Sequence, residues 1–335
     1  MVNKEKKNIN QEQIEFFKKI KHSIPSNQSL VEVVSELLGV ENNAAYCRIR
    51  GEKLLNFDEL VAICRHFQIS FDSIAGGIVD SKQIQCDYTP LDLRNINGFV
   101  DYLQCMSKKV ENIKSGIEPE IIISASDLSS FNLLAYKELT LFKLFSWSKN
   151  VYGYCATYNE FVNDLSDNKL LESILKKIVA NYQLIPSTEI WMNNTIDPFL
   201  GLISYHYEMG HFSDAKIPLM LCNQMQDMMS TMQKWAEKGA KGAKNTPFNL
   251  YISEIGVSNT YVLMKTAKST ACMFRLYTIN RLITYDDVFC RETEDWLRNL
   301  VQRGTLISGA SEKARHKFFN KQQMKISTLI DRLCR

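Results

Sequence analysis

Apolar residues recur at helical spacing through the first part of the chain and define its first two helices. Residues 11–24 form one amphipathic segment, which Pro25 ends because proline cannot continue a helix. A second segment follows Ser29, whose hydroxyl can cap a helix, and breaks at Gly39-Val40. The apolar positions of the two segments are Ile14, Phe17, Ile20, Ile24, Leu30, Val33, Val34, Leu37 and Leu38.

A short third helix and a fourth apolar segment complete this pattern. The short helix is predicted from about Asn42 to Arg50, with Gly51 in the position where a left-handed C-cap favours glycine. Behind residues 57–59 a further apolar stripe can cover the preceding helices, and its members are Leu60, Val61, Ile63, Cys64 and Phe67. Residues 29–74 therefore read as a helix-turn-helix with a small core of its own.

The second helix of such a pair reads DNA when it lies in the major groove with its outward side chains against base edges. Amides can bridge the adenine edge and guanidinium groups the guanine edge, while Arg50 and Lys53 at the helix exit suit phosphates better. The division between base and phosphate contacts stays open. The candidate DNA-binding residues are Asn42, Asn43, Tyr46, Cys47, Arg48, Arg50 and Lys53.

The order of these elements resembles the lambda-repressor-like, Cro/C1-type family. The segments that carry the resemblance are LVEVVSELLGV, ENNAAYCRIRG and FDELVAICRHFQIS, which match an amphipathic helix with Gly-Val, a recognition helix with an Arg-Gly ending, and a covering helix. Arg48 departs from the family, because it lies near an apolar position, and we expect Ala45 and Ile49 to hold the helix down instead. The resemblance implies a DNA-binding domain over residues 11–76.

Residues 77–115 are predicted to be a linker followed by a helix. Residues 78–93 have mixed polarity and no helical period, whereas Asn95–Lys114 carries one apolar stripe. A helix directly after a DNA-binding domain often makes the dimer contact. The stripe fits a second copy and the chain's own second domain equally well.

Residues 116–335 are predicted to form a mostly helical regulatory or sensor domain. A β-branched run at residues 120–124 predicts a buried strand, and helices are expected over 139–147, 169–182, 195–208, 213–236, 286–303 and 312–333. The apolar period changes to two over 249–255, 260–265 and 270–277, which predicts a small antiparallel meander near the C-terminus. The fold class is therefore mainly α, with an N-terminal helix-turn-helix bundle and a larger α+β domain.

Composition and charge limit how the chain can bind DNA. At 335 residues, with 45% apolar and 23% charged residues, it is long enough for about two globular domains. The net charge of +3 excludes a polybasic coat, and acidic residues roughly offset basic ones in the first 75 residues. Weak local charge favours a homodimer, which would double the phosphate contacts.

The sequence shows neither a membrane span nor the apolar run of a signal peptide near its beginning, so we expect a cytoplasmic protein with no membrane partner. Nine cysteines are scattered without a C-x-x-C pair, which argues against a zinc ribbon or a disulfide framework.

Other sites are weaker candidates. His206 and His211 are five residues apart, which does not place them on one helix face, so no metal site is predicted. Residues 239–245, GAKGAKN, read as a flexible basic connection rather than a phosphate loop. An aromatic effector pocket would use Trp191, Phe199, Tyr205 and Tyr207, and an anion site at the last helix would use Ser308, Ser311, Glu312, Lys313 and Arg315.

The sequence lacks the nucleophile-elbow, dinucleotide and Walker A motifs, so neither an enzyme nor a cofactor is expected. With IPSTEIW, YHYEMGHF and LISGASEKAR in its second domain, the chain looks like long helix-turn-helix proteins common in Bacteroides-type bacteria. The favoured hypothesis is a homodimeric regulator that binds double-stranded DNA, with a second domain that senses an unknown small-molecule or protein effector or builds the dimer. The alternative is a scaffold protein that uses a repressor-like fold against another protein.

Overall fold

The computed structural model describes residues 2–23, 29–67, 69, 84–91, 96–153, 157–166, 168–276 and 280–334. The chain divides into an N-terminal unit, Met1–Gln83, and a C-terminal unit, Ile84–Arg335, each with its own core. The predicted boundary at residue 76 lies outside the described residues, as does Ile24.

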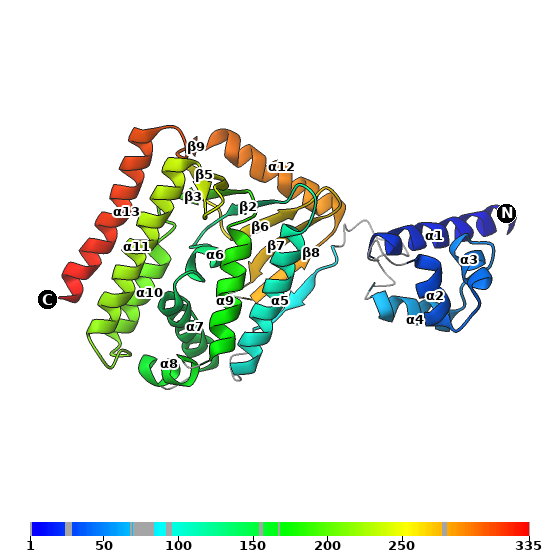
Figure 1. Ribbon diagram of the computed structural model, residues 1–335, viewed down its shortest axis with the longest axis horizontal. Coiled ribbons are helices and arrows are strands. Elements are labelled where there is room, and N and C mark those ends of the chain that lie inside the picture. The colour runs from blue at the N-terminus through cyan, green and yellow to red at the C-terminus, as the bar shows by residue number, and fades with distance from the viewer. Residues whose placement is uncertain are drawn as a thin grey trace. The chain divides into compact units, whose positions relative to one another are not determined.

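The described residues of the N-terminal unit form four helices, which are drawn in blue shades in Figure 1. The first begins at Val2, earlier than predicted, and the three others match the sequence pattern. Their bounds are α1 (Val2–Ser23), α2 (Leu30–Leu38), α3 (Asn42–Ile49) and α4 (Phe57–Phe67). The fully buried side chains at their centre are Phe16, Phe17, Ile20, Val34, Ala45 and Ile63.

The turn between α2 and α3 has the geometry that the sequence predicted. Gly39 adopts a left-handed conformation with φ of 61°, and its N–H donates to the carbonyl of Glu36. Val40 then closes the turn through its N–H to the Ser35 carbonyl and by accepting from the Ser35 hydroxyl. Ser29 precedes α2 in extended conformation, but its side chain makes no capping hydrogen bond.

The C-terminal unit combines helices with one mixed sheet. Its helices are α5 (Ile96–Lys114), α6 (Ser130–Leu133), α7 (Lys137–Tyr152), α8 (Tyr158–Ser166), α9 (Lys169–Tyr182), α10 (Asp197–Glu208), α11 (Lys216–Lys238), α12 (Asp287–Arg303) and α13 (Glu312–Leu333). Its strands are β1 (Asp87–Thr89), β2 (Glu120–Ser124), β3 (Ser187–Met192), β4 (Ala240–Lys241), β5 (Thr246–Ser253), β6 (Tyr261–Lys265), β7 (Thr270–Leu276), β8 (Asn280–Thr284) and β9 (Thr305–Leu306).

The small antiparallel meander predicted near the C-terminus is correct for β6 and β7, which pair antiparallel, but wrong for β5 and for the size of the sheet. Within the described residues the sheet has nine strands in the order β1-β8-β7-β6-β2-β3-β5-β4, with β9 beside β5. Strand β5 pairs in parallel with β3, and β3 in parallel with β2, so β5 does not neighbour β6. The predicted β5, β6 and β7 exist within a few residues of their expected bounds, although Tyr277 lies outside the described residues.

Alternating side chains place two cores on the two faces of this sheet. Along β2, Ile121 and Ile123 belong to the larger core, whereas Ile122 joins a smaller one with Leu297 and Leu300 of α12. The larger core collects buried side chains from α5 to α11 and from α13. In Figure 1, α11 and α13 run side by side, and α12 is the orange helix near the strands.

Helix α5 packs onto its own unit. Its stripe of Val100, Leu103 and Val110 is buried in the larger core, and the helix lies against α9. The apolar stripe that fitted a dimer contact is therefore used within the chain, and α5 belongs to the C-terminal unit rather than to a linker. No helix in the described ranges is both long enough and apolar enough to span a bilayer.

Candidate nucleic-acid interface

Helix α3 presents a polar outer face. Asn42, Asn43, Tyr46 and Arg50 are exposed, and Cys47 is half-buried beside them. Positions 43, 46, 47 and 50 follow the spacing i, i+3, i+4, i+7, which places them on one side of the helix. The opposite side carries buried Ala45 and half-buried Ile49, which hold the helix onto the core as expected.

Arg48 does not belong to the outer face, which corrects its place among the predicted DNA contacts. Its side chain is only 5% exposed and forms an ion pair with Glu59 of α4, with 2.6 Å between Nη2 and Oε1. Nε donates to the second oxygen of Glu59 at 3.1 Å, and Nη1 donates to the carbonyl of Ala44 at 3.0 Å. A bidentate pair lets a guanidinium occupy a position that an apolar residue would otherwise fill.

Glu59 joins the recognition helix to the start of the covering helix. Besides accepting from Arg48, it accepts from the N–H of Asn56, whose amide oxygen accepts from the N–H of Glu59 in a capping box. The hydrogen bond from Arg48 is the main cause that lowers the pKa of Glu59 and, reciprocally, raises that of Arg48. The pair therefore stays charged near neutral pH and sets the angle between α3 and α4.

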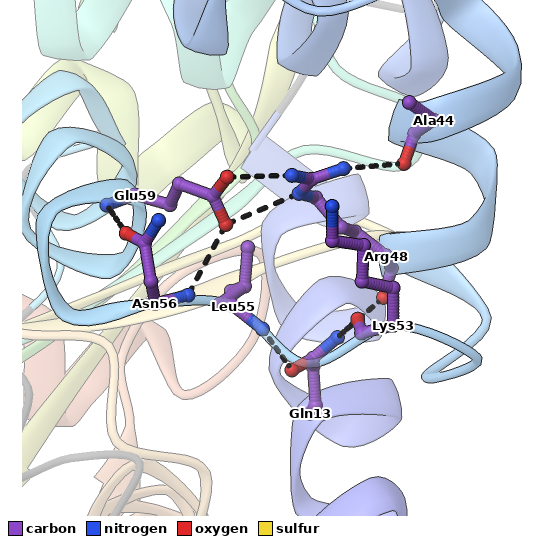
Figure 2. A network of polar contacts seen from close by, with 7 residues as sticks. All are labelled: Gln13, Ala44, Arg48, Lys53, Leu55, Asn56 and Glu59. Carbon is purple, nitrogen blue, oxygen red and sulfur yellow. Dashed lines mark hydrogen bonds and ion pairs between the residues drawn. The ribbon is translucent and has the colours of Figure 1, made fainter.

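Gln13 of α1 performs a similar task at the same, C-terminal end of α3. Its amide nitrogen donates to the carbonyls of Arg48 and Lys53 at 2.6 and 2.8 Å, and its oxygen accepts from the N–H of Leu55 at 2.9 Å. Figure 2 shows Gln13 beside the backbone that follows α3 and the Arg48 side chain turned toward Glu59. The sequence offered no signal for Gln13, because its partners are more than 30 residues away.

Gly51 confirms the predicted left-handed ending, with φ of 70°. A Cβ added there would lie 2.9 Å from the carbonyl oxygen of Asn10 in α1, so the close approach of α1 also requires glycine.

The basic residues at the exit of α3 remain accessible. Arg50 is exposed, lies over the Tyr46 ring at 5.5 Å, and has its Nε 3.3 Å from Glu52 Oε1. Because both side chains of that ion pair are more than half exposed, it is weak and exchangeable for a phosphate contact. Lys53 is likewise exposed.

The histidines of the C-terminal unit contact each other. The Nδ1 atoms of His206 and His211 lie 2.9 Å apart, and no group of three potential metal ligands occurs among the described residues. His206 is fully buried next to Phe142 and Phe145. Burial, followed by the nearby charges of His211 and Lys149, lowers the pKa of His206 to about 4.

The lowered pKa of His206 predicts that the C-terminal unit loses stability in acid. The folded-state pKa of His206 lies below its usual 6.5, so its contribution to stability is complete above pH 6.5 and is lost as pH falls toward about 4. The loss is at most about 1.4 kcal/mol per pH unit. Thermal unfolding of the C-terminal unit should therefore shift down over this range, and less steeply in His206→Leu. His316→Asn, which changes an exposed histidine, serves as control, and an unchanged slope in His206→Leu would contradict the assignment.

The remaining candidates do not assemble into sites. Trp191 and Phe199 are fully buried core residues, whereas Tyr205 and Tyr207 are exposed, so the four do not line one pocket. The anion candidates at α13 are also dispersed. Ser308 is buried and accepts from the N–H of Leu250, and Arg315 donates to two backbone carbonyls. Glu312 and Lys313 line a surface hollow that carries both signs of charge.

Comparison of the chain with family models, curated proteins and solved structures gives no match.

Proposed function

We propose that the N-terminal unit binds double-stranded DNA as part of a homodimeric, cytoplasmic transcription regulator. The observation that carries the proposal is the outer face of α3, where amide, phenol and guanidinium groups stand exposed after a glycine turn. A helix held in this way can enter the major groove with Asn42, Asn43 and Tyr46 toward base edges. Arg50 and Lys53 would then contact phosphates.

The balanced charge of the N-terminal unit favours DNA binding by a dimer. Lys and Arg residues are balanced by Asp and Glu over Met1–Gln83, so one copy provides little general attraction to DNA. Two copies on half-sites about one helical turn apart would double the specific contacts. The C-terminal unit would hold the copies together or sense an effector.

The test is selection of bound duplexes from genomic fragments, followed by affinity measurements on the selected site. Replacing Asn43 and Arg50 with alanine should weaken binding at least tenfold, since a base contact is worth about 1–3 kcal/mol. Lys268→Ala, at an exposed turn of the C-terminal unit, is the control and should bind normally. Wild-type affinity in the Asn43→Ala/Arg50→Ala protein would refute the proposed interface.

The balanced charge also favours a second candidate, a protein-interaction module built on the same helices. The salt dependence of binding distinguishes the two functions. Binding to DNA should weaken steeply as salt rises, with a slope of about −0.9 per phosphate neutralised. A protein partner on the same face of α3 would lack that dependence and would remain bound when competitor DNA is added.

A further inference from the structure

The C-terminal unit contains a partly open cavity between the sheet and helices α5, α6 and α7. Its volume is about 80 Å³, enough for several waters or a small organic molecule, because one water needs roughly 10–15 Å³. Most of the lining is apolar, and these residues include Phe99, Leu103, Met106, Leu128, Phe131 and Val262. Such a lining favours a ligand with an apolar body.

One wall carries a buried cation whose hydrogen-bonding capacity is largely unused. Arg281 of β8 is 4% exposed, and its Nε and Nη2 have no hydrogen-bond partner within the described part of the chain. Nη1 lies 3.9 Å from the sulfur of Met273, and the guanidinium lies 4.0 Å from the centroid of the Tyr102 ring. Burial raises the pKa of the Tyr102 hydroxyl, and the charge of Arg281 acts to lower it. A guanidinium stays charged and offers five donors, so burying it without an acceptor is costly.

The other charges around the cavity do not compensate Arg281. Lys143 and Arg275 also line the cavity, and both are directed to the carboxylate of Asp127, at 2.7 and 3.5 Å. Among these described side chains, Asp127 is thus the one carboxylate beside three cations, and it pairs with Lys143 and Arg275. The site has an excess of positive charge inside a largely apolar wall.

Three hydroxyl groups of the lining are already engaged. Ser129 accepts from the N–H of Phe131, Thr140 donates to the carbonyl of Leu133, and Thr260 lies 3.3 Å from the hydroxyl of Ser126. Among the buried side-chain N and O atoms of the described lining, those without a hydrogen-bond partner are Nε and Nη2 of Arg281, and they suit an acceptor with two oxygens.

We propose that this cavity binds a small organic monocarboxylate, whose carboxylate meets Arg281 and whose apolar body occupies the space beside Phe131 and Leu103. An inorganic anion would satisfy the guanidinium but leave the apolar walls against a strongly hydrated ion. The proposal that a carboxylate binds here does not rest on DNA binding; only the consequence that the carboxylate acts as an effector rests on the proposed function.

The test uses the full chain and two probes, hexanoate and benzoate, against hexan-1-ol, benzyl alcohol and inorganic phosphate. Calorimetry should show saturable binding of at least one carboxylate, weaker binding of its alcohol and none of phosphate. Arg281→Met should weaken carboxylate binding about tenfold or more, as loss of a charged hydrogen bond predicts. Arg303→Met, at the exposed end of α12, is the matched control and should bind as the wild type does.

A second measurement keeps the proposal testable apart from affinity. Without ligand, Arg281→Met should unfold at the same temperature as the wild type or higher, because the variant removes an uncompensated buried charge. The proposal fails if neither carboxylate binds, if phosphate binds as tightly, if Arg281→Met binds normally, or if that variant is strongly destabilised without ligand. None of these outcomes depends on DNA, so failure of this proposal can be distinguished from failure of the proposed DNA-binding function.

Discussion

Replacing Glu59 with alanine should lower the free energy of unfolding of the N-terminal unit by about 3–5 kcal/mol, since it leaves a buried guanidinium without its carboxylate. The side chain of Arg48 is 5% exposed and has both of its long-range hydrogen bonds to Glu59. The substitution also removes the acceptor for the N–H of Asn56 at the start of α4. Hydrogen exchange of peptides from α2 to α4 would measure the loss within this unit alone.

The matched control is Glu15→Ala, which breaks an exposed pair with Lys18 and should cost less than about 1 kcal/mol. Replacing Arg48 by methionine together with Glu59→Gln should recover much of the stability, because no charge then remains buried and unpaired. Equal costs for Glu59→Ala and Glu15→Ala would show that the buried pair does not organise the unit. DNA binding should follow the folded fraction of α3 in these variants.

Glu189→Ala is expected to have the second large effect, a loss of roughly 4 kcal/mol or more in the C-terminal unit. Glu189 is fully buried in β3 and accepts three hydrogen bonds, from Tyr182 at 2.5 Å, Trp191 at 2.7 Å and Asn132 at 3.0 Å. Alanine would leave all three donors buried without an acceptor. Urea denaturation should show a lower midpoint with an unchanged slope.

The charge balance near Glu189 makes its loss more costly. Lys241 is buried with its amine 3.4 Å from the centroid of the Tyr182 ring and hydrogen-bonded to Ser187. Burial lowers the pKa of Lys241 to about 7, while the charge of Glu189 acts to raise it. Glu237→Ala, at an exposed position of α11, controls for the loss of a carboxylate. A midpoint for Glu189→Ala within error of that control would overturn the role assigned to this network.

The elements of the N-terminal unit were predictable because their signals are local. The breaks at Gly39 and Gly51 depend on a left-handed backbone that glycine adopts without strain, and the apolar stripes of α2 and α4 depend on the helical period. The exposed positions 42, 43, 46 and 50 follow from the same period. Their role in DNA binding stays a prediction.

The C-terminal unit was harder to predict because its central sheet depends on pairs distant in sequence. Strand β3 was missed since its buried positions include Ser187 and Glu189, which are polar and satisfied only by residues from other elements. The basic segment at 239–245 was expected to be a flexible connection. The structure instead includes it in β4 and the turn to β5, with Lys241 buried.

The sequence by itself determined α2, α3, α4 and the candidate face of α3, because period and turn chemistry act over a few residues, whereas it did not predict that α1 begins at Val2. Tertiary structure alone decided which charged groups point inward. Arg48 turns into the core because Glu59 of the next helix pairs with it there, and Gln13 of α1 donates to the backbone carbonyl of Arg48 at the end of α3. The candidate role of Arg281 is likewise visible only in the folded C-terminal unit, where strand pairing and helix packing place Nε and Nη2 at a largely apolar cavity without an acceptor among the described residues. Burial of a charge depends on partners brought together by folding, and local pattern does not contain that information.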